Sequence, residues 1–272
     1  MAKYAIGLDY GTLSVRALLV DIETGEELAA SVYEYPHGVM VESLPSGEKL
    51  PPDWALQHPV DYQDGLVSTV REVMAVSGVR PEDVIGLGVD FTGSTVLAVK
   101  ADGTPLCCME EFVHEPHAYV KLWKHHGGEE EARIIDQVAK ERKEAWLAYY
   151  GGKVSSEWML PKILETLRRC PRVYHAADRM IDAIDWIIWQ MTGVETRSVC
   201  GAGYKAFYRH DTGYPSKEFL RALDEKAGTT EMEHLVEDKL DAPIKSIGET
   251  TGYLTEAMAE RLGLCSGTPV GT

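Results

Sequence analysis

The hydrophobic pattern opens with two apolar runs that flank a short polar turn. The first run covers residues 4–8 and ends at the carboxylate Asp9, and the second begins beyond Gly11 and Thr12 and continues to residue 20. Apolar runs of this length bounded by turn residues predict two strands joined in a tight hairpin. A third apolar run over residues 27–35 follows another polar turn, so we expect an antiparallel meander of three strands.

Beyond this meander the hydrophobic pattern predicts a loop, a helix and two further strands. Residues 36–52 are rich in Gly, Pro and Ser, which predicts a surface loop. Residues 61–76 carry apolar side chains at helical spacing, which predicts an amphipathic helix. The near-continuous apolar run over residues 84–90 predicts a buried strand covered on both faces, and residues 96–99 predict a further strand.

The second half of the chain is mainly helical by pattern. The expected helical segments are residues 115–150, 158–168, 183–191, 217–226 and 255–261. A short strand is expected at residues 178–181, a loop of small residues at 200–206, and the start of a strand at Val270. We therefore expect one large α/β domain, with a mixed sheet flanked by helices and with an inserted or appended helical lobe.

Composition and charge restrict the classes of function. The 272 residues are 44% hydrophobic and 26% charged, which is typical of a globular protein. The formal net charge of −16 argues against a nucleic-acid partner, because no basic surface is available to replace counterions. With no run of about 18 apolar residues and no apolar leader, we expect no membrane span and a cytoplasmic location. The cysteines lack paired spacing and are expected as reduced thiols: Cys107, Cys108, Cys170, Cys200 and Cys265.

Two predicted strand ends combine a carboxylate with a turn of Gly, Thr or Ser. Asp9 precedes the turn at residues 10–12, and Asp90 precedes the turn at residues 91–95. Such a turn can direct backbone N–H groups at a phosphate while the carboxylate holds a metal ion or its water shell. Because ligands of α/β sheets bind beyond the carboxyl ends of strands, the two ends together indicate one site. The alternatives are an ordinary polar hairpin tip at Asp9 and a loop cap at Asp90.

Three other features could carry chemistry. Lys205 follows two glycines that let backbone approach a ligand, so it could hold an oxygen-rich substrate, and the alternative is an exposed lysine on a flexible turn. Asp185 lies inside an apolar helix and needs a partner or a wet cavity; local pairing and catalysis both remain open. Four histidines match no common zinc spacing, so we expect no metal site there: His114, His117, His125 and His126.

Several separated motifs together resemble one protein family. Five segments carry the resemblance: residues 7–16 (GLDYGTLSVR), 88–95 (GVDFTGST), 122–124 (LWK), 155–158 (SSEW) and 201–205 (GAGYK). In this order they are similar to the N-terminal half of the FGGY family of carbohydrate kinases. The motifs span nearly the whole chain, so the match is far more specific than any one of them.

The resemblance implies a fold, a reaction and a domain organisation. The fold would be actin-like and ribonuclease-H-like, with two such domains closing over ATP and a polyol or ketose. Residues 1–272 would be the N-terminal sugar-binding domain with its end truncated, and the C-terminal nucleotide-binding domain would lie outside this chain. The implied reaction is ATP-dependent, Mg²⁺-assisted phosphorylation of L-ribulose or a related ketopentose at a terminal hydroxyl, and the 272-residue piece alone would be inactive.

The resemblance also implies roles for individual residues. Asp9 would lie near Mg²⁺. The expected phosphate-loop residues are Gly11, Thr12, Ser14 and the supporting Arg16. The expected sugar-side residues are Thr92, Gly93, Ser94, Trp123 and Lys205, with Asp90 shaping the loop. The catalytic base would be an Asp just beyond Thr272, so no catalytic base is expected within the chain. His125 replaces an Asp found in many relatives and receives no role.

Other classes of function remain open at this point. One is an actin- or chaperone-like ATPase module, which the first hairpin would serve equally well, although the turn at residues 92–95 and Lys205 argue against it. Another is a different kinase of the same family, acting on xylulose or glycerol. A third is a non-catalytic relative that binds sugar or nucleotide only. The expected partner is the small-molecule sugar, and a homodimer is one assembly to test.

Overall fold

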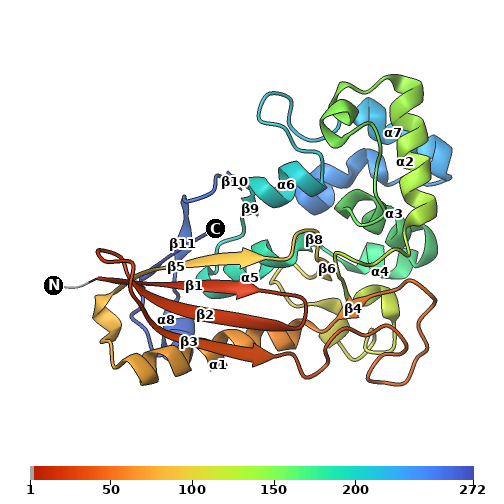
Figure 1. The fold of residues 1–272 in the computed structure, drawn as a ribbon. Coiled ribbons are helices and arrows are strands. Elements are labelled where there is room, and N and C mark those ends of the chain that lie inside the picture. The colour runs from red at the N-terminus through yellow and green to blue at the C-terminus, as the bar shows by residue number, and fades with distance from the viewer. Residues whose placement is uncertain (1–2) are drawn as a thin grey trace.

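A six-stranded mixed sheet forms the centre of the larger body of the molecule (Figure 1). The computed structural model describes residues 3–272, without the side chain of Tyr204. The strand order is β11-β12-β5-β1-β2-β3. The bounds of these strands are β1 Tyr4–Tyr10, β2 Ser14–Asp21, β3 Glu27–Glu34, β5 Val84–Phe91, β11 Thr250–Tyr253 and β12 Pro269–Gly271. The expected hairpin and three-stranded meander are confirmed, since β1, β2 and β3 pair antiparallel.

The register of the sheet brings three strand ends to one edge. Strand β5 runs parallel to β1, with Asp90 opposite Asp9, and β12 runs parallel to β5, with Gly271 opposite Gly88. The chain therefore leaves β1, β5 and β12 at the same edge of the sheet, as expected for the two strand-end carboxylates. Figure 1 shows the arrowheads of β1 and β5 side by side, below the upper lobe.

Only one face of the central strands is buried. In β5 the burial alternates: Val89 and Phe91 are buried, whereas Gly88 and Asp90 are exposed. The prediction that this strand is covered on both faces was wrong. Its apolar run is continuous only because glycines, which are small rather than hydrophobic, occupy the open face. The buried face packs against α1 (Pro59–Ser77), α5 (Ala183–Thr192) and α8 (Glu256–Leu262) in one hydrophobic core.

Smaller sheets connect this body to the helical lobe. A four-stranded sheet has the order β4-β7-β6-β8, with β4 Leu56–Gln57, β7 Val120–Lys121, β6 Val96–Val99 and β8 Arg179–Asp182. A parallel pair is formed by β9 (Arg197–Ser198) and β10 (Ile244–Lys245). Strand β8 ends at the cavity described below, so this small sheet positions part of the site.

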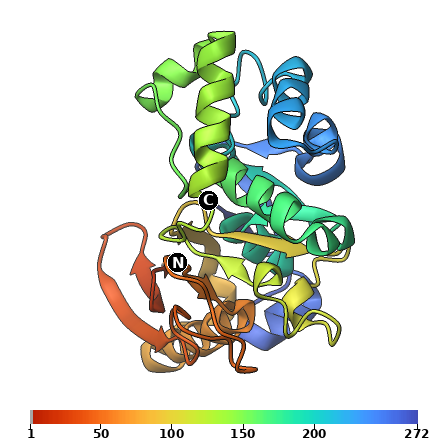
Figure 2. The same cartoon turned by 90° about the vertical axis from the view of Figure 1, so that its right-hand side faces the viewer.

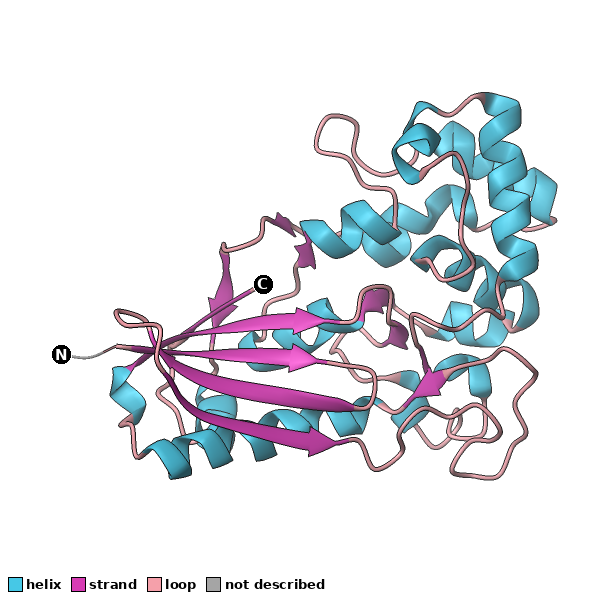
Figure 3. Cartoon of the chain, in the orientation of Figure 1, coloured by secondary structure: helices cyan, strands magenta, loops and turns pink. Residues whose placement is uncertain are grey.

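The upper lobe is built from helices, as Figures 2 and 3 show. Its helices are α2 Glu129–Arg142, α3 Met159–Arg169, α6 Val199–Lys205 and α7 Lys217–Ala227, and α4 (Pro171–Ala176) follows α3. Short turns of 3₁₀ helix occur at Pro81–Asp83, Leu106–Cys108, Pro116–Ala118, Ala145–Tyr150 and Met232–His234, and a π-helical turn at Val236–Leu240. The lobe has its own hydrophobic core, which includes Trp146, Phe207 and Phe219. The expected helical insertion is confirmed.

The expected helix over residues 115–150 and the expected loop over residues 200–206 both differ in the structure. Helix α2 covers only Glu129–Arg142, and residues 116–118 and 145–150 form 3₁₀ turns. Residues 120–121 form strand β7 and not helix, because they pair with β4 and β6 in the small sheet. Residues 199–205 form helix α6 and not a loop, since the Ser198 side chain accepts a hydrogen bond from the N–H of Cys200 and starts the helix despite its two glycines. Among residues 3–272, no helix is both long enough and apolar enough to cross a lipid bilayer.

Candidate functional site

The hairpin tip and the exposed sheet face form the first half of the site. A hollow of about 380 Å³ lies on this face, lined by Gly7, Leu8, Asp9, Leu18, Gly88, Val89, Asp90 and Thr272. The side chain of Asp9 is about half exposed, and its Oδ2 accepts a hydrogen bond from Nη1 of Arg16 at 3.1 Å. Exposed charges attract each other weakly, so Asp9 keeps oxygens available to solvent or to a cation.

The turn between β1 and β2 is held by side chains from distant segments. The N–H of Gly11 donates to the carbonyl of Ser14 at 2.9 Å, and a Cβ at Gly11 would lie only 3.2 Å from that oxygen. Trp123 Nε1 donates to the hydroxyl of Thr12 at 3.1 Å, and Gln57 Nε2 donates to the Thr12 carbonyl at 2.8 Å. Thr12 therefore has a fixed position, and its hydroxyl proton remains available for an acceptor.

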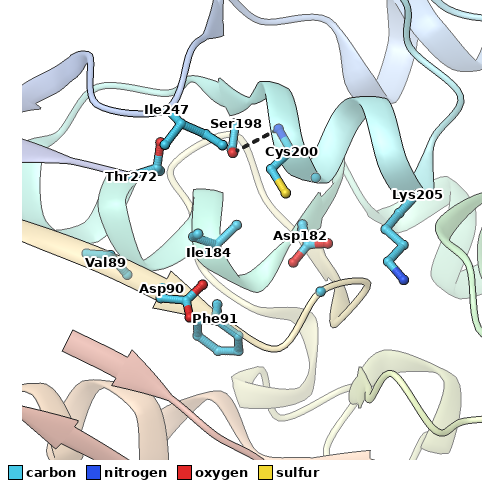
Figure 4. A pocket seen from close by; sticks show the side chains of 12 residues that line it. Val89, Asp90, Phe91, Asp182, Ile184, Ser198, Cys200, Lys205, Ile247 and Thr272 are labelled. Atoms are coloured by element: carbon cyan, nitrogen blue, oxygen red, sulfur yellow. Dashed lines mark hydrogen bonds between the residues drawn. The ribbon is translucent and has the colours of Figure 1, made fainter. Parts of the chain in front are cut away.

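A second hollow, of about 290 Å³, lies between the sheet edge and α6 (Figure 4). Its lining comes from the end of β5, the following loop, the end of β8, the start of α5 and both ends of α6. The lining residues are Val89, Asp90, Phe91, Gly93, Asp182, Ile184, Ser198, Cys200, Gly201, Lys205, Ile247 and Thr272. The lining is mainly apolar with a few polar groups, which is typical of pockets for small organic ligands.

Gly93 and Lys205 meet in this second hollow although they are far apart in the chain. A Cβ at Gly93 would lie 3.3 Å from Cε of Lys205, so glycine leaves room for the lysine stem. Burial lowers the pKa of Lys205, and the nearby Asp182 and Glu157 carboxylates oppose that effect. A cationic donor at the end of a mainly apolar hollow can bind ligand oxygens with little competition from water.

Asp182 is a site residue that sequence reasoning missed. It is buried at the end of β8, and its Oδ2 accepts a hydrogen bond from the N–H of Ser94 at 3.0 Å. Within the described part of the chain, its Oδ1 has no hydrogen-bond partner. Burial raises the pKa of Asp182 to about 6, while the Ser94 N–H and the Lys162 ammonium lower it. The available signal was an acid directly after an apolar strand, the same signal that singled out Asp9 and Asp90.

The remaining expected residues occupy other places. Ser94 is fully buried, and its hydroxyl donates to the carbonyl of Glu157 at 2.7 Å, so it lies behind the second hollow and not in its lining. The Thr92 hydroxyl lies 3.1 Å from that of Thr95 within the same loop. Trp123 lies beside Thr12 at the hairpin. The structure thus groups Gly93 with Lys205, and Asp9 with Gly11 to Arg16.

The other polar features that the sequence singled out lie outside both hollows. Asp185 is buried in α5, and its Oδ1 accepts a hydrogen bond from the N–H of Ser198 at 2.7 Å. His125 is buried, with its Nε2 2.9 Å from Oε2 of Glu165. Within residues 3–272, no group of three or more His, Cys, Asp or Glu side chains is arranged to hold a metal ion.

The two hollows share one wall, formed by Val89, Asp90 and Thr272. A ligand in the second hollow and an anion at the hairpin would therefore approach each other across the end of β5.

Residues 4–272 match the model of the FGGY family of carbohydrate kinases, N-terminal domain. The chain belongs to the FGGY family of carbohydrate kinases. It is 52% identical over 269 residues to the ribulokinase of Geobacillus thermodenitrificans and 50% identical over 269 residues to that of Anoxybacillus flavithermus. Each match covers 98% of this chain and 47% of the relative, so the chain spans about half the length of the curated relatives it matches.

Solved structures of xylulose and gluconate kinases share this fold. The xylulose kinase from Rhodospirillum rubrum has a TM-score of 0.72 at 22% identity, and covers 99% of this chain and 48% of its own. The gluconate kinase from Lactobacillus acidophilus has a TM-score of 0.71 at 16% identity, over 99% of this chain and 47% of its own. At these identities the likeness concerns the fold alone, and it confirms the expected actin-like α/β class of the FGGY kinases.

Proposed function

We propose that this chain is the sugar-binding half of an ATP-dependent kinase that phosphorylates L-ribulose, or a closely related ketopentose, at a terminal hydroxyl. The observation that carries the proposal is the wall that the two hollows share at Asp90 and Thr272. Relatives about half identical over nearly the whole chain bear the name ribulokinase, which supports the choice of sugar. Phosphoryl transfer needs a donor phosphate and an acceptor hydroxyl held in line, and two hollows that meet can hold both.

The sugar would occupy the second hollow, which lies beneath α6. Lys205 would donate to its oxygens, and the backbone at Gly93 would approach it closely because no side chain intervenes. The γ-phosphate would lie at the hairpin, where Thr12 offers its hydroxyl and Gly11 keeps the turn tight. Ser14 and Arg16 would support that turn, Arg16 through its contact with Asp9.

Asp9 fits an Mg²⁺ site at the phosphate. Its exposed carboxylate faces Asp90 on the next strand, and Mg²⁺ commonly binds one or two carboxylates, waters and substrate phosphates. The ion would supply charge neutralisation at the transferred phosphate. The acceptor of the hydroxyl proton, the second phosphate loop and the adenine pocket would come from a C-terminal nucleotide-binding domain, which would follow Thr272 at this wall.

The setting of the enzyme is part of the same proposal. We place it in the cytoplasm, where ATP and free sugars are available, with the ketopentose as its partner and without nucleic acid or membrane. The net charge of −16 supports this, because it disfavours polyanions. The first assembly to test is a homodimer.

The test is ADP release by the natural protein at full length, with MgATP and L-ribulose, xylulose or glycerol. We expect release that depends on L-ribulose and is slower with the other two. Lys205→Met should raise the KM for sugar by about tenfold or more and leave the KM for ATP within about twofold, because it removes a sugar contact only. Asp9→Asn should abolish turnover while calorimetric sugar binding persists. The surface variant Lys217→Met is the matched control and should behave as the parent.

Two results would overturn the proposal. One is ATP hydrolysis that ignores every sugar and responds to a protein partner, as in a chaperone-like ATPase. The other is sugar binding without turnover in the full-length protein, as in a non-catalytic relative.

A further inference from the structure

The loop after β5 is fixed through one residue, Ser94. Its N–H donates to Oδ2 of Asp182 at 3.0 Å, and its hydroxyl donates to the carbonyl of Glu157 at 2.7 Å. Its carbonyl accepts a hydrogen bond from Nζ of Lys162 at 2.7 Å. Every polar group of Ser94 is therefore bonded to a different segment, and the residue is fully buried.

Ser94 adopts a backbone conformation that a serine does not choose by itself. Its φ is +67°, in the left-handed region that favours glycine. Such a conformation costs on the order of 1 kcal/mol and persists only where the surroundings impose it. The three hydrogen bonds supply that constraint, and they set the path of the chain at Gly93, which lines the hollow beneath α6.

Lys162 differs from the other two partners because it connects two segments. It lies in α3 with its side chain fully buried, and its Nζ also donates to the carbonyl of Leu122 at 2.7 Å. The residue after Leu122 is Trp123, whose ring nitrogen donates to Thr12 at the hairpin tip. One buried amine thus joins the loop of the second hollow to the segment that holds the turn between β1 and β2.

We propose that Lys162 is a positioning residue, whose buried amine holds the loop at residues 92–95 and the segment at residues 122–123 in one fixed arrangement for sugar binding. The link to sugar binding rests on the proposed function. The clamp itself, meaning the two hydrogen bonds from Lys162 Nζ to the carbonyls of Ser94 and Leu122, rests on the geometry. Removing the amine would leave the buried Ser94 carbonyl without a donor and the Leu122 carbonyl with only the N–H of His125, and it would free the strained Ser94 to relax. Burial lowers the pKa of Lys162 and the Asp182 carboxylate opposes this, yet both charge forms carry at least two N–H donors, enough for the two carbonyls.

The first experiment measures the clamp without any ligand, by amide hydrogen exchange. Lys162→Met keeps the length and apolar stem of the side chain and removes its donors. We expect exchange in peptides covering residues 92–97 and 120–125 to become at least about tenfold faster, because local opening no longer breaks two buried hydrogen bonds. Exchange in α1 and β3 should remain as in the parent.

Lys239→Met is the control. Lys239 also donates from Nζ to a backbone carbonyl, that of Ala177, and neither residue belongs to the two clamped segments. It should destabilise the lobe without selective opening of residues 92–97. Equal opening in both lysine variants would overturn the proposal, because the effect would then be a general loss of stability.

The second experiment separates the KM for sugar from that for ATP in the full-length protein. Lys162→Met should raise the KM for L-ribulose by about tenfold or more, since a displacement of about 1 Å at a binding loop can cost as much as 100-fold. The KM for ATP should change less. An unchanged sugar KM together with faster exchange would overturn the link to sugar and leave the clamp standing. If no sugar is phosphorylated by the parent either, the proposed function fails, and the exchange result decides the clamp independently.

Lys162→Gln covers the case in which the methionine variant does not fold. Its shorter amide keeps two N–H donors, so it should restore part of the protection at residues 92–97. Full parental exchange with Lys162→Met, in folded protein, would overturn the proposal. Where only Lys162→Gln folds, faster exchange spread over the whole protein instead of residues 92–97 and 120–125 would overturn it.

Discussion

At the scale of residues, two buried carboxyls three positions apart have different tasks. Asp182 ends β8, binds the N–H of Ser94 and keeps one oxygen without a partner at the second hollow. Asp185 lies one turn further along, in α5, and binds the N–H of Ser198, the N-cap of α6. The first therefore shapes the loop at the hollow, whereas the second fixes the start of the helix that carries Lys205.

Asp185 should make the protein less stable as the pH rises. Burial, helped by the Asp182 and Glu195 carboxylates, raises its pKa to about 8, while Arg197 and the Ser198 N–H oppose this. In the unfolded chain an Asp titrates near pH 4, so the folded state binds the proton more tightly and loses up to about 1.4 kcal/mol per pH unit between pH 4 and 8. Asp185→Asn keeps an acceptor for Ser198 and lacks this loss, so its stability relative to the parent should increase across that window.

Urea unfolding at pH 5, 6.5 and 8 measures this difference. The exposed Asp64→Asn is the control and should follow the parent at each pH. A constant offset between Asp185→Asn and the parent would contradict the prediction.

Functional side chains were predictable from the sequence only where they lay at the end of a long apolar run. Asp9 and Asp90 each follow a long apolar run, and the structure places them opposite each other. Asp182 is the last residue of a strand of only four residues, which is too short to stand out beside the apolar helix that contains Asp185. The role of Lys162 depends on a carbonyl 68 positions away, a contact that no local pattern contains.

At the scale of elements, α1 lies unusually close to the meander. A Cβ at Gly65, in the middle of α1, would lie 2.4 Å from Cγ1 of Val15 on β2 and 3.0 Å from Cδ1 of Tyr33 on β3. Glycine normally weakens a helix, and here it allows the helix axis to approach the sheet. The fit between α1 and the hairpin strands therefore depends on the absence of one methyl group.

Gly65→Ala should destabilise the fold although it favours helix. Overpacking costs about 1–3 kcal/mol, and the gain in helix propensity of about 1 kcal/mol offsets only part of it. We expect a lower thermal midpoint for Gly65→Ala. Ser68→Ala, on the exposed side of the same helix, should leave the midpoint unchanged or slightly higher. A Gly65→Ala protein as stable as the parent would contradict the prediction, because Val15 would then have moved to make room for the methyl group.

Helices and strands were predictable where the hydrophobic pattern extended over many residues. The predictions were wrong where pairing with strands distant in sequence determined the structure. The pattern at residues 61–76 lies wholly within α1. Val120 has helical neighbours in the pattern, but it belongs to a two-residue strand that exists only because β4 and β6 flank it. Residues 199–205 contain two glycines and still form α6, because the Ser198 cap outweighs propensity.

At the scale of the whole molecule, the two halves of the site differ in how complete they are. The hollow beneath α6 is enclosed by described residues from several elements, whereas the hollow at Asp9 lies on an open sheet face. We therefore expect the 272-residue chain by itself to bind L-ribulose in calorimetry but to release no measurable ADP from MgATP. The physical reason is that phosphoryl transfer needs positioning of both substrates and exclusion of water, which an open face does not provide.

A titration of the same chain with xylulose and glycerol is the control for sugar selectivity. ADP release by the isolated chain at a rate like that of the full-length protein would contradict the prediction. Absence of sugar binding in a folded chain would show that the sugar pocket, too, requires further residues.

The position of β12 also governs the order in which the protein can assemble. This strand lies between β5 and β11, and its Val270 pairs with Leu87, which lies far earlier in the sequence. While the chain is being synthesised, the strands up to β5 can pair, but the edge of β5 stays open until residues 269–271 leave the ribosome. Contacts so distant in sequence form slowly, and an open strand edge is prone to pair with other chains. The strand that completes the wall of the site is therefore also the strand whose late synthesis leaves the edge of β5 open to aggregation.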